Sequence, residues 1–228
     1  MLFEPEIDPA IWRLRPDFAA FSITVRDGRN GPADAASAAM LADAAAGLEG
    51  SAPWAAAHLE AWRAAYRAFG AKPQRTPSSA EALRKRAGSL PAVNRLVDAY
   101  NGLSLRYAVP IGGEDLDAYV GRPRLTVATG GEPFATVRDG APASEPVESG
   151  EVIWRDDAGV TCRRWNWRQS VRTRLEPHST AMWFVLERLE PMPLDALEEA
   201  GAALTTAVRE LAPAADVSAR LLQGSAAG

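Results

Sequence analysis

Apolar residues recur at helical spacing along the first half of the chain. In residues 53–69, Trp54, Trp62 and Phe69 follow a period of 3.6, which places them on one face of a helix. Ser51 is a preferred N-cap residue, and we expect this helix to begin directly after it. By the same pattern, further helices are predicted over residues 33–48, 79–86 and 91–106.

The spacing of apolar residues changes to a period of two after Pro110. Alternation of this kind, combined with β-branched and aromatic residues, is typical of half-buried strands. Gly-rich turns such as Gly130-Gly131 separate the segments, which favours antiparallel hairpins. Strands are predicted over residues 124–129, 134–137, 152–154, 160–165 and 180–189.

The two ends of the chain complete the predicted fold. Residues 2–26 are expected to be extended, because three prolines interrupt helices there. Residues 193–211 have the period of an amphipathic helix, and residues 225–228 are expected to be a frayed tail. Helices in the first half and antiparallel strands in the second predict an α+β fold, with antiparallel β-sheets packed with helices, in one domain over residues 1–228.

Charges are distributed unevenly, although the net charge of the 228 residues is only −4. Residues 61–106 contain nine basic and two acidic residues, giving 9 − 2 = +7, so the remainder carries −4 − 7 = −11. Residues 163–174 contain five arginines and no acidic residue. Such asymmetry indicates a polyanionic partner, and solvated helix faces in an arginine-rich protein are the alternative.

Composition and motifs exclude several classes of site. The single cysteine, Cys162, rules out a disulfide scaffold and C-x-x-C zinc knuckles, and two histidines, His58 and His178, argue against a metal site. We expect His58 to pack in the core and Cys162 to be an unreactive strand residue. There is no G-x-S-x-G nucleophile elbow, P-loop or G-x-G-x-x-G fingerprint, and we expect no cofactor.

The sequence also lacks a signal for membranes. No apolar run approaches the ~20 residues that span a bilayer. The first residues are acidic, unlike those of a signal peptide. We therefore expect a soluble, cytoplasmic protein that has no membrane partner.

Three polar features are candidates for chemistry. Asn94, Asp98 and Asn101 share one helix face at i, i+4 and i+7, where such groups either cap neighbouring segments or line a pocket. Residues 112–117 place three carboxylates after a Gly pair. This segment is either a loop that orients an amine or a water molecule, or an ordinary acidic turn. Residues 165–169 alternate aromatic and polar groups, as in a base-stacking surface or in ordinary core packing.

These residues carry a resemblance to a known family. Residues 78–101, SSAEALRKRAGSLPAVNRLVDAYN, resemble a tract in the B3/B4 editing domain of the phenylalanyl-tRNA synthetase beta subunit, Leu-x-x-Arg-Leu followed by Pro-x-Asn-Asn-x-Val-Asp-x-Thr-Asn-Tyr. Residues 116–119 resemble its Leu-His-Ala-Phe segment. Residues 128–140, ATGGEPFATVRDG, resemble its Gly-Glu hairpin, and residues 185–187 its Leu-Leu-Glu strand.

The resemblance implies a freestanding member of this family and a division of the chain. Residues 1–60 are expected to form an N-terminal extension, residues 60–190 the family-like core, and residues 193–211 the C-terminal helix. The implied activity is trans-editing, in which water hydrolyses the ester of a mischarged aminoacyl-tRNA that no synthetase holds. A second site that removes mistakes restores fidelity where one pocket cannot reject near-isosteres.

Several site residues follow from the resemblance. Asn101 corresponds to the pocket Asn of the family, and Glu187 corresponds to the Glu that selects a phenolic hydroxyl. Tyr100 replaces a Thr, Asp117 replaces the pocket His, and residues 165–169 replace the Gly-rich turn that closes the synthetase site. Asp117 and Asn101 are therefore the candidate catalytic residues, and an acid at position 117 binds the α-ammonium or acts as a base.

The other candidates bind the substrate or the RNA. The substrate-binding candidates are Glu187, Tyr100, Asn94, Asp98, Asn166 and Gln169. The basic residues expected to contact tRNA are Arg75, Arg84, Lys85, Arg86, Arg164 and Arg168. Alternation along strand 180–189 puts Glu187 on the face of Trp183 and Val185, where it is either buried against a partner or ligand or exposed and paired with an arginine.

Two functions remain open beside editing. One is an RNA-binding module that keeps the fold without activity. The other is a hydrolase or binder of a small amine-bearing molecule. The expected partner is aminoacylated tRNA, and no obligate protein partner is evident.

Overall fold

Helices dominate the chain before Pro110, and strands follow it, as the sequence predicts. The computed structural model describes residues 4–50 and 52–224. The helices are α1 (Pro9–Leu14), α2 (Ala35–Ala46), α3 (Ala55–Ala68), α4 (Ser79–Lys85), α5 (Arg95–Tyr107) and α6 (Leu194–Leu211). The strands are β1 (Glu6–Ile7), β2 (Ala19–Arg26), β3 (Ile111–Asp115), β4 (Arg124–Val127), β5 (Pro133–Arg138), β6 (Ala141–Pro146), β7 (Val152–Arg155), β8 (Val160–Arg163), β9 (Arg168–Gln169), β10 (Met182–Arg188) and β11 (Asp216–Gln223).

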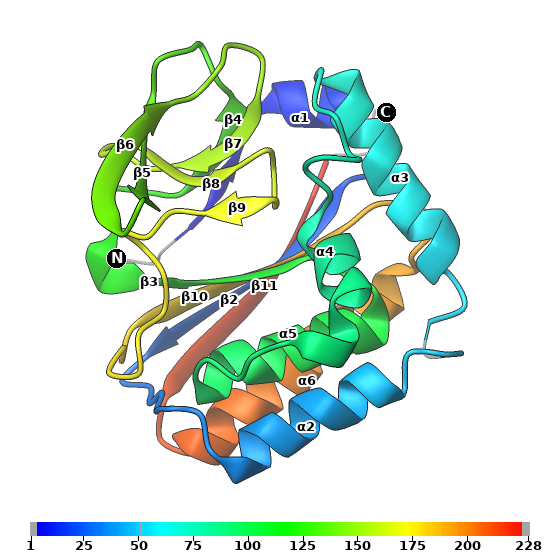
Figure 1. Cartoon of the computed structure of the whole chain (residues 1–228), viewed down its shortest axis with the longest axis vertical. Coiled ribbons are helices and arrows are strands. Elements are labelled where there is room, and N and C mark those ends of the chain that lie inside the picture. Colours follow the sequence, from blue (N-terminus) through cyan, green and yellow to red (C-terminus); the bar gives the residue numbers. More distant parts are fainter. Residues whose placement is uncertain (1–3, 51, 225–228) are drawn as a thin grey trace.

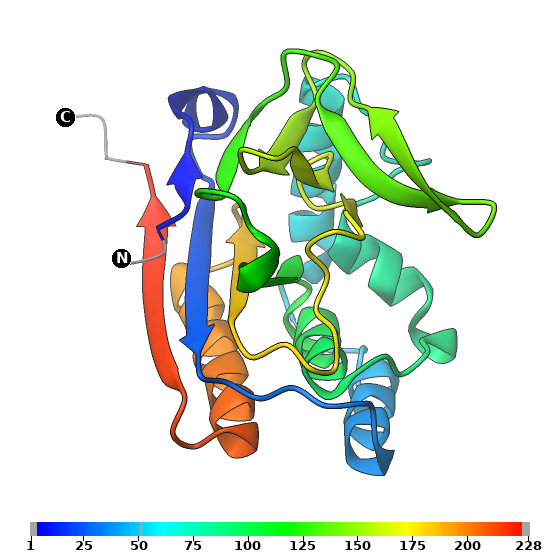
Figure 2. The ribbon, with the colours of Figure 1, turned by 90° about the vertical axis from the view of Figure 1, so that its left-hand side faces the viewer.

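These elements form three layers (Figure 1). A four-stranded sheet, in the order β11-β2-β10-β3, lies in the middle. A seven-stranded sheet, in the order β1-β4-β7-β8-β5-β6 with β9 added to β8, lies on one side of it, and α2, α5 and α6 lie on the other. Figure 2 shows β11 next to β2 at the outer edge of the middle sheet. The α+β fold class predicted from the sequence is confirmed.

Alternation along β10 joins the three layers. Met182, Phe184 and Leu186 pack into the hydrophobic core on the helix side, which includes residues of α5 and α6. Trp183 and Val185 pack into a second core between the two sheets. Because successive side chains of a strand point to opposite faces, β10 separates a dry helical core from the inter-sheet space that holds the pocket described below.

Most expected elements are confirmed, and the differences have local causes. Residues 2–26 were expected to be extended, but Pro9 is the first residue of α1, where its missing N–H costs nothing, and Asp8 caps this helix by accepting from the Ala10 N–H at 2.7 Å. The helix expected over 91–106 begins at Arg95, because Asn94 is its N-cap. The expected cap Ser51 and the expected tail 225–228 lie outside the described residues.

Two helical glycines provide a test of packing between the layers. A Cβ added at Gly201 of α6 would lie 2.3 Å from Phe21 Cδ1, whereas one added at Gly102 of α5 would meet nothing closer than 3.6 Å. We expect Gly201→Ala to lower the free energy of unfolding by about 2 kcal/mol through overpacking. Gly102→Ala is expected to raise it by about 0.5–1 kcal/mol, because alanine favours helices. Urea unfolding of both variants measures the difference, and equal effects would contradict this packing.

Candidate functional site

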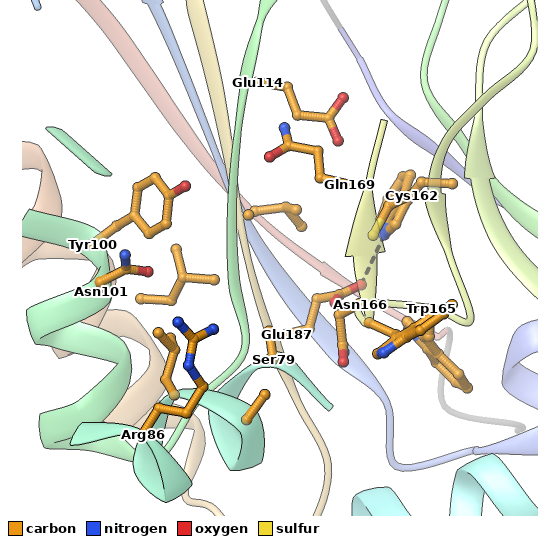
Figure 3. A pocket seen from close by; sticks show the side chains of 17 residues that line it. Ser79, Arg86, Tyr100, Asn101, Glu114, Cys162, Trp165, Asn166, Gln169 and Glu187 are labelled. Atoms are coloured by element: carbon orange, nitrogen blue, oxygen red, sulfur yellow. Dashed lines mark hydrogen bonds between the residues drawn. The ribbon is translucent and has the colours of Figure 1, made fainter. Parts of the chain in front are cut away.

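A pocket of about 220 Å³ lies between the two sheets, at the end bordered by α4 and α5 (Figure 3). Its walls combine indole rings with a few polar groups. The residues that line it are Ser79, Ala82, Leu83, Arg86, Tyr100, Asn101, Ile111, Gly112, Glu114, Trp154, Cys162, Trp165, Asn166, Trp167, Gln169, Val185 and Glu187. An apolar cavity with few convergent polar groups is the usual form of a small-molecule site.

Glu187 is the buried carboxyl group in the wall formed by β10. Only 2% of its surface is exposed. Its Oε1 accepts from Trp154 Nε1 and its Oε2 accepts from Asn166 Nδ2, both at 2.9 Å. Burial raises the pKa of Glu187 to about 7, and these hydrogen bonds oppose the increase. The structure therefore favours burial against partners over the alternative of an exposed strand end paired with an arginine.

A tight turn after β8 positions Asn166 against Glu187. Arg164 and Trp165 both have positive φ, 48° and 67°, which reverses the chain so that β9 can pair with β8. Tyr66 of α3 donates its hydroxyl hydrogen to Asn166 Oδ1 at 2.9 Å. This bond fixes the amide so that its Nδ2 faces the carboxyl group of Glu187.

Glu114 is the second buried carboxyl group of the pocket. It follows Gly113 in β3, whose absent side chain leaves room for Tyr100, while Glu114 points into the space between the sheets with 4% exposure. The Tyr119 hydroxyl donates to its Oε2, and the hydroxyl groups of Thr161 and Thr173 also lie close enough to the carboxyl group to lower its pKa. Burial raises the pKa of Glu114 to about 7. Every side chain that the structure places against this carboxyl group as a hydrogen-bond partner carries a hydroxyl group.

Two further groups complete this wall. Gln169 donates from Nε2 to the Gly113 carbonyl oxygen at 2.8 Å, which ties β9 to β3 across the pocket. Cys162 lines the pocket, and burial raises the pKa of its thiol well above the usual value. At neutral pH Cys162 is therefore a protonated thiol, in line with the expectation of an unreactive residue.

The opposite wall comes from α4 and α5. Tyr100 and Asn101 face the cavity from α5, and Arg86 stands exposed at its rim directly after α4 (Figure 3). Burial raises the pKa of Tyr100, so its hydroxyl stays protonated. The structure thus brings Tyr100, Asn101, Asn166, Gln169 and Glu187 of the predicted set into one pocket.

Three predicted site residues lie elsewhere. Asp117 is exposed on the 3₁₀ turn Leu116–Ala118 and does not line the pocket, because Glu114, in the strand just before it, takes the inward position. Asn94 caps α5 by accepting from the Val97 N–H at 2.9 Å.

The third of these residues, Asp98, is buried and stabilises the start of α5. Its carboxylate accepts from the Ser37 hydroxyl at 2.7 Å and from the Val93 N–H at 2.8 Å. The capping alternative is therefore the one that the structure supports for Asn94 and Asp98, and they are corrected from pocket residues to structural ones.

The basic residues expected to bind tRNA fall into two groups. Arg84 donates to the backbone carbonyl oxygens of Leu105 and Leu48, and Lys85 pairs with the buried Glu81, so both already have partners within the protein. Arg168 is half-buried and donates to Thr136 Oγ1 at 2.6 Å.

Arg75 and Arg164 line a second cavity of about 410 Å³ together with Lys72, Glu148 and Glu151, and Arg164 pairs with Glu151 at 3.5 Å. Arg164 lies 4.6 Å from the ring centre of Trp167, a residue of the first pocket. The two cavities therefore meet at the turn after β8. Lys72 was not among the predicted residues, although its charge belongs to the basic segment 61–106.

Neither a metal site nor a membrane span is found in the described part of the chain. Residues 4–50 and 52–224 contain no group of three or more His, Cys, Asp or Glu side chains placed to hold a metal ion. Within the same ranges, no helix combines the length and apolar character needed to cross a membrane.

Comparison with known proteins identifies the family. No curated protein matches the chain. A crystal structure of an N-terminal fragment of the phenylalanyl-tRNA synthetase beta-subunit from Pyrococcus horikoshii is similar over 93% of this chain and 49% of that one, with 12% identity and a TM-score of 0.46. The chain thus spans about half the length of that fragment. The model of the B3/4 domain matches residues 61–210, well over half of the sequence, and the chain therefore belongs to the B3/4 domain family.

Proposed function

We propose that this protein hydrolyses the ester bond of mischarged aminoacyl-tRNA that no synthetase holds. The observation that carries the proposal is the pocket itself. Asn101 and Glu187, which the family resemblance implies as binding residues, line it together although they are 86 positions apart. Membership of the B3/4 family supports the same substrate class, as do the exposed cations Lys72 and Arg75 in the cavity beside the pocket.

The chemistry needs only a placed water and a base. Water attacks the ester carbonyl carbon, its proton passes to the Glu114 carboxylate, and the C–O bond to the terminal ribose breaks. The same proton then passes to the ribose oxygen, which leaves as a hydroxyl group, so the base is regenerated. A carboxyl group with a pKa near 7 is well matched to this task at neutral pH. Glu114 suits it better than Glu187, because the partners of Glu114 are hydroxyl groups, which can rotate to release an oxygen, whereas the partners of Glu187 are N–H groups that can only donate.

Release of amino acid from charged tRNA tests this assignment. The purified protein is incubated with correctly and wrongly charged tRNAs, and we expect Glu114→Gln to lower turnover by 10²–10⁴-fold, the usual contribution of a general base. Asp117→Asn removes a charge three positions away, outside the pocket, and is expected to cost far less. A larger loss of turnover in Asp117→Asn than in Glu114→Gln would contradict this assignment and favour Asp117, the residue that the family resemblance implies.

Docking of RNA is expected to depend on the exposed cations of the second cavity. For the described residues, no ion pair is found at Lys72 or Arg75. The double variant Lys72→Ala/Arg75→Ala should lower the slope of log K against log salt by about 1.4–1.8, since each phosphate contact contributes about 0.7–0.9. Arg209→Ala, an exposed cation of α6, is the control. An unchanged slope in the double variant would mean that the second cavity does not contact RNA.

The two experiments together separate the alternatives. Binding of charged tRNA without release of amino acid would identify an RNA-binding module. Absence of both would favour a binder of a small amine-bearing molecule.

A further inference from the structure

Glu187 is a buried carboxyl group without a cationic partner. Its two hydrogen bonds come from neutral donors, Trp154 and Asn166, and no ion pair joins it to any residue in 4–50 or 52–224. A buried carboxylate is costly unless an opposite charge balances it. The ionised Glu187 side chain therefore lacks a balancing positive charge among the described residues.

Trp165 adds a donor beside Glu187. Its side chain is fully buried and lines the pocket, and its Nε1–H lies close enough to the Glu187 carboxyl group to lower the pKa of that group but makes no hydrogen bond of good geometry within the described residues. The indole nitrogen faces the side of the cavity where Glu187 and Asn166 lie (Figure 3). Buried donors are almost always satisfied in folded proteins, and a donor held beside Glu187 without a hydrogen bond of good geometry is placed to donate to an acceptor of a ligand that binds there.

We infer that Glu187 binds the α-ammonium group of the ligand and that the Trp165 indole N–H donates to the neighbouring carbonyl oxygen. A cation and an acceptor oxygen separated by two carbon atoms, Cα and the carbonyl carbon, are what an aminoacyl group presents. The inference deepens the proposed function and rests on it for the RNA-linked form of the substrate. It differs from the side-chain role that the family resemblance implies for Glu187.

Charges around the pocket favour a cation at this place. Glu114 lines the same cavity as a second carboxyl group. Arg86 is the one cationic side chain among the pocket-lining residues described, and it is exposed at the rim. The other titratable groups of the lining, Tyr100 and Cys162, are neutral at pH 7, because burial raises the pKa of both. An ammonium group that enters the pocket therefore meets a negative interior.

Small amides test the inference without tRNA. Four compounds separate the two sources of an amine: norleucinamide has only the α-amine, Nα-acetyl-lysinamide only the side-chain amine, lysinamide both, and Nα-acetyl-norleucinamide neither. Calorimetric titration at pH 8 measures their affinities. We expect each compound with a free α-amine to bind at least tenfold more tightly than its acetylated counterpart.

Variants connect this preference to Glu187. In Glu187→Gln the tenfold preference for the free α-amine should disappear, while Glu198→Gln, an exposed acid of α6, should keep it. Trp165→Phe removes the indole N–H and should weaken both norleucinamide and its acetylated form. If Glu187→Gln does not fold, the affinities of the four compounds for the wild-type protein are sufficient to test the inference, because only the ligand differs between those titrations.

Three results would overturn the inference. They are equal binding of free and acetylated amides, no binding of any of the four compounds, and a preference that follows the side-chain amine. None of them decides whether the protein deacylates tRNA, which is followed separately by release of amino acid. Conversely, a protein that prefers free α-amines but releases no amino acid would keep the inference and refute the proposed hydrolysis.

Discussion

His58→Ala is expected to lower the free energy of unfolding by about 4 kcal/mol, through a lost side chain and unsatisfied buried groups. The imidazole is fully buried, as the sequence predicts for a core residue. Its Nε2 accepts from Trp62 Nε1 and from the Leu189 N–H, both at 3.1 Å, and its Nδ1 faces the Ala108 carbonyl oxygen at 2.9 Å. Removing the ring leaves all three groups without a partner, in the middle of the contact between α3 and the end of β10.

Urea unfolding of the variant provides the measurement. Arg67→Ala, on the exposed side of the same helix, is the control, and its ion pair with Glu60 is too exposed to contribute much. A loss no larger than that of the control would mean that the three hydrogen bonds contribute nothing to stability.

The same geometry makes the protein sensitive to acid. Both donors at Nε2 of His58 oppose a proton there, and burial, the largest cause, lowers the pKa of His58 to about 4. Since the folded value lies below the unfolded value of 6.5, the stabilisation is complete above about pH 6.5 and is lost as the pH falls toward 4. The loss amounts to about 3 kcal/mol.

Glu187→Gln is expected to raise the free energy of unfolding at pH 8 by about 2 kcal/mol, although it removes a group of the pocket. Burial raises the pKa of Glu187 to about 7 from 4.5, so the folded chain holds the proton more tightly than the unfolded chain. Stability from this group is therefore fully present below about pH 4.5 and is lost as the pH rises through about 7. Glutamine has no charge to bury, so the gain should vanish near pH 5.

Unfolding curves at pH 5, 6, 7 and 8 check this expectation against Glu198→Gln. Glu114 follows the same direction, because burial also raises its pKa to about 7. His58 acts in the opposite direction over an overlapping range, and the single variants separate the two contributions. Identical pH profiles for Glu187→Gln and the wild type would mean that Glu187 is not desolvated.

Periodicity located the helices and most strands, and the elements it missed have specific causes. Pro9 was read as a helix breaker, but proline is favoured in the first turn, and Asp8 supplies the cap. β3 contains Gly112-Gly113, which have low strand propensity, and its pairing with β10 decides its conformation. β11 alternates weakly because it is an edge strand with little buried surface.

The sequence predicted part of each wall of the candidate site, namely Tyr100 and Asn101 on one and Asn166, Gln169 and Glu187 on the other. Alternation placed Glu187 beside Trp183 and Val185, and the structure confirms its burial. The resemblance favours Asp117 because it replaces the pocket His, but pairing of β3 with β10 turns Glu114 inward, and Asp117 lies exposed on the turn that follows. Arg84 donates to the backbone carbonyl oxygens of Leu105 and Leu48, which are distant in the sequence. No local sequence pattern predicts such contacts.

The outermost strand of the middle sheet determines how far the chain can be shortened. β11 pairs with β2 along all eight residues of that strand, whereas the family match ends at residue 210, before β11 begins. A chain cut at that point would expose a full row of unpaired N–H and C=O groups on β2, beside the buried Ile23 and Val25. Such an edge recruits strands from other molecules. We therefore expect a minimal domain that ends at the family boundary to aggregate more readily than a chain that includes β11.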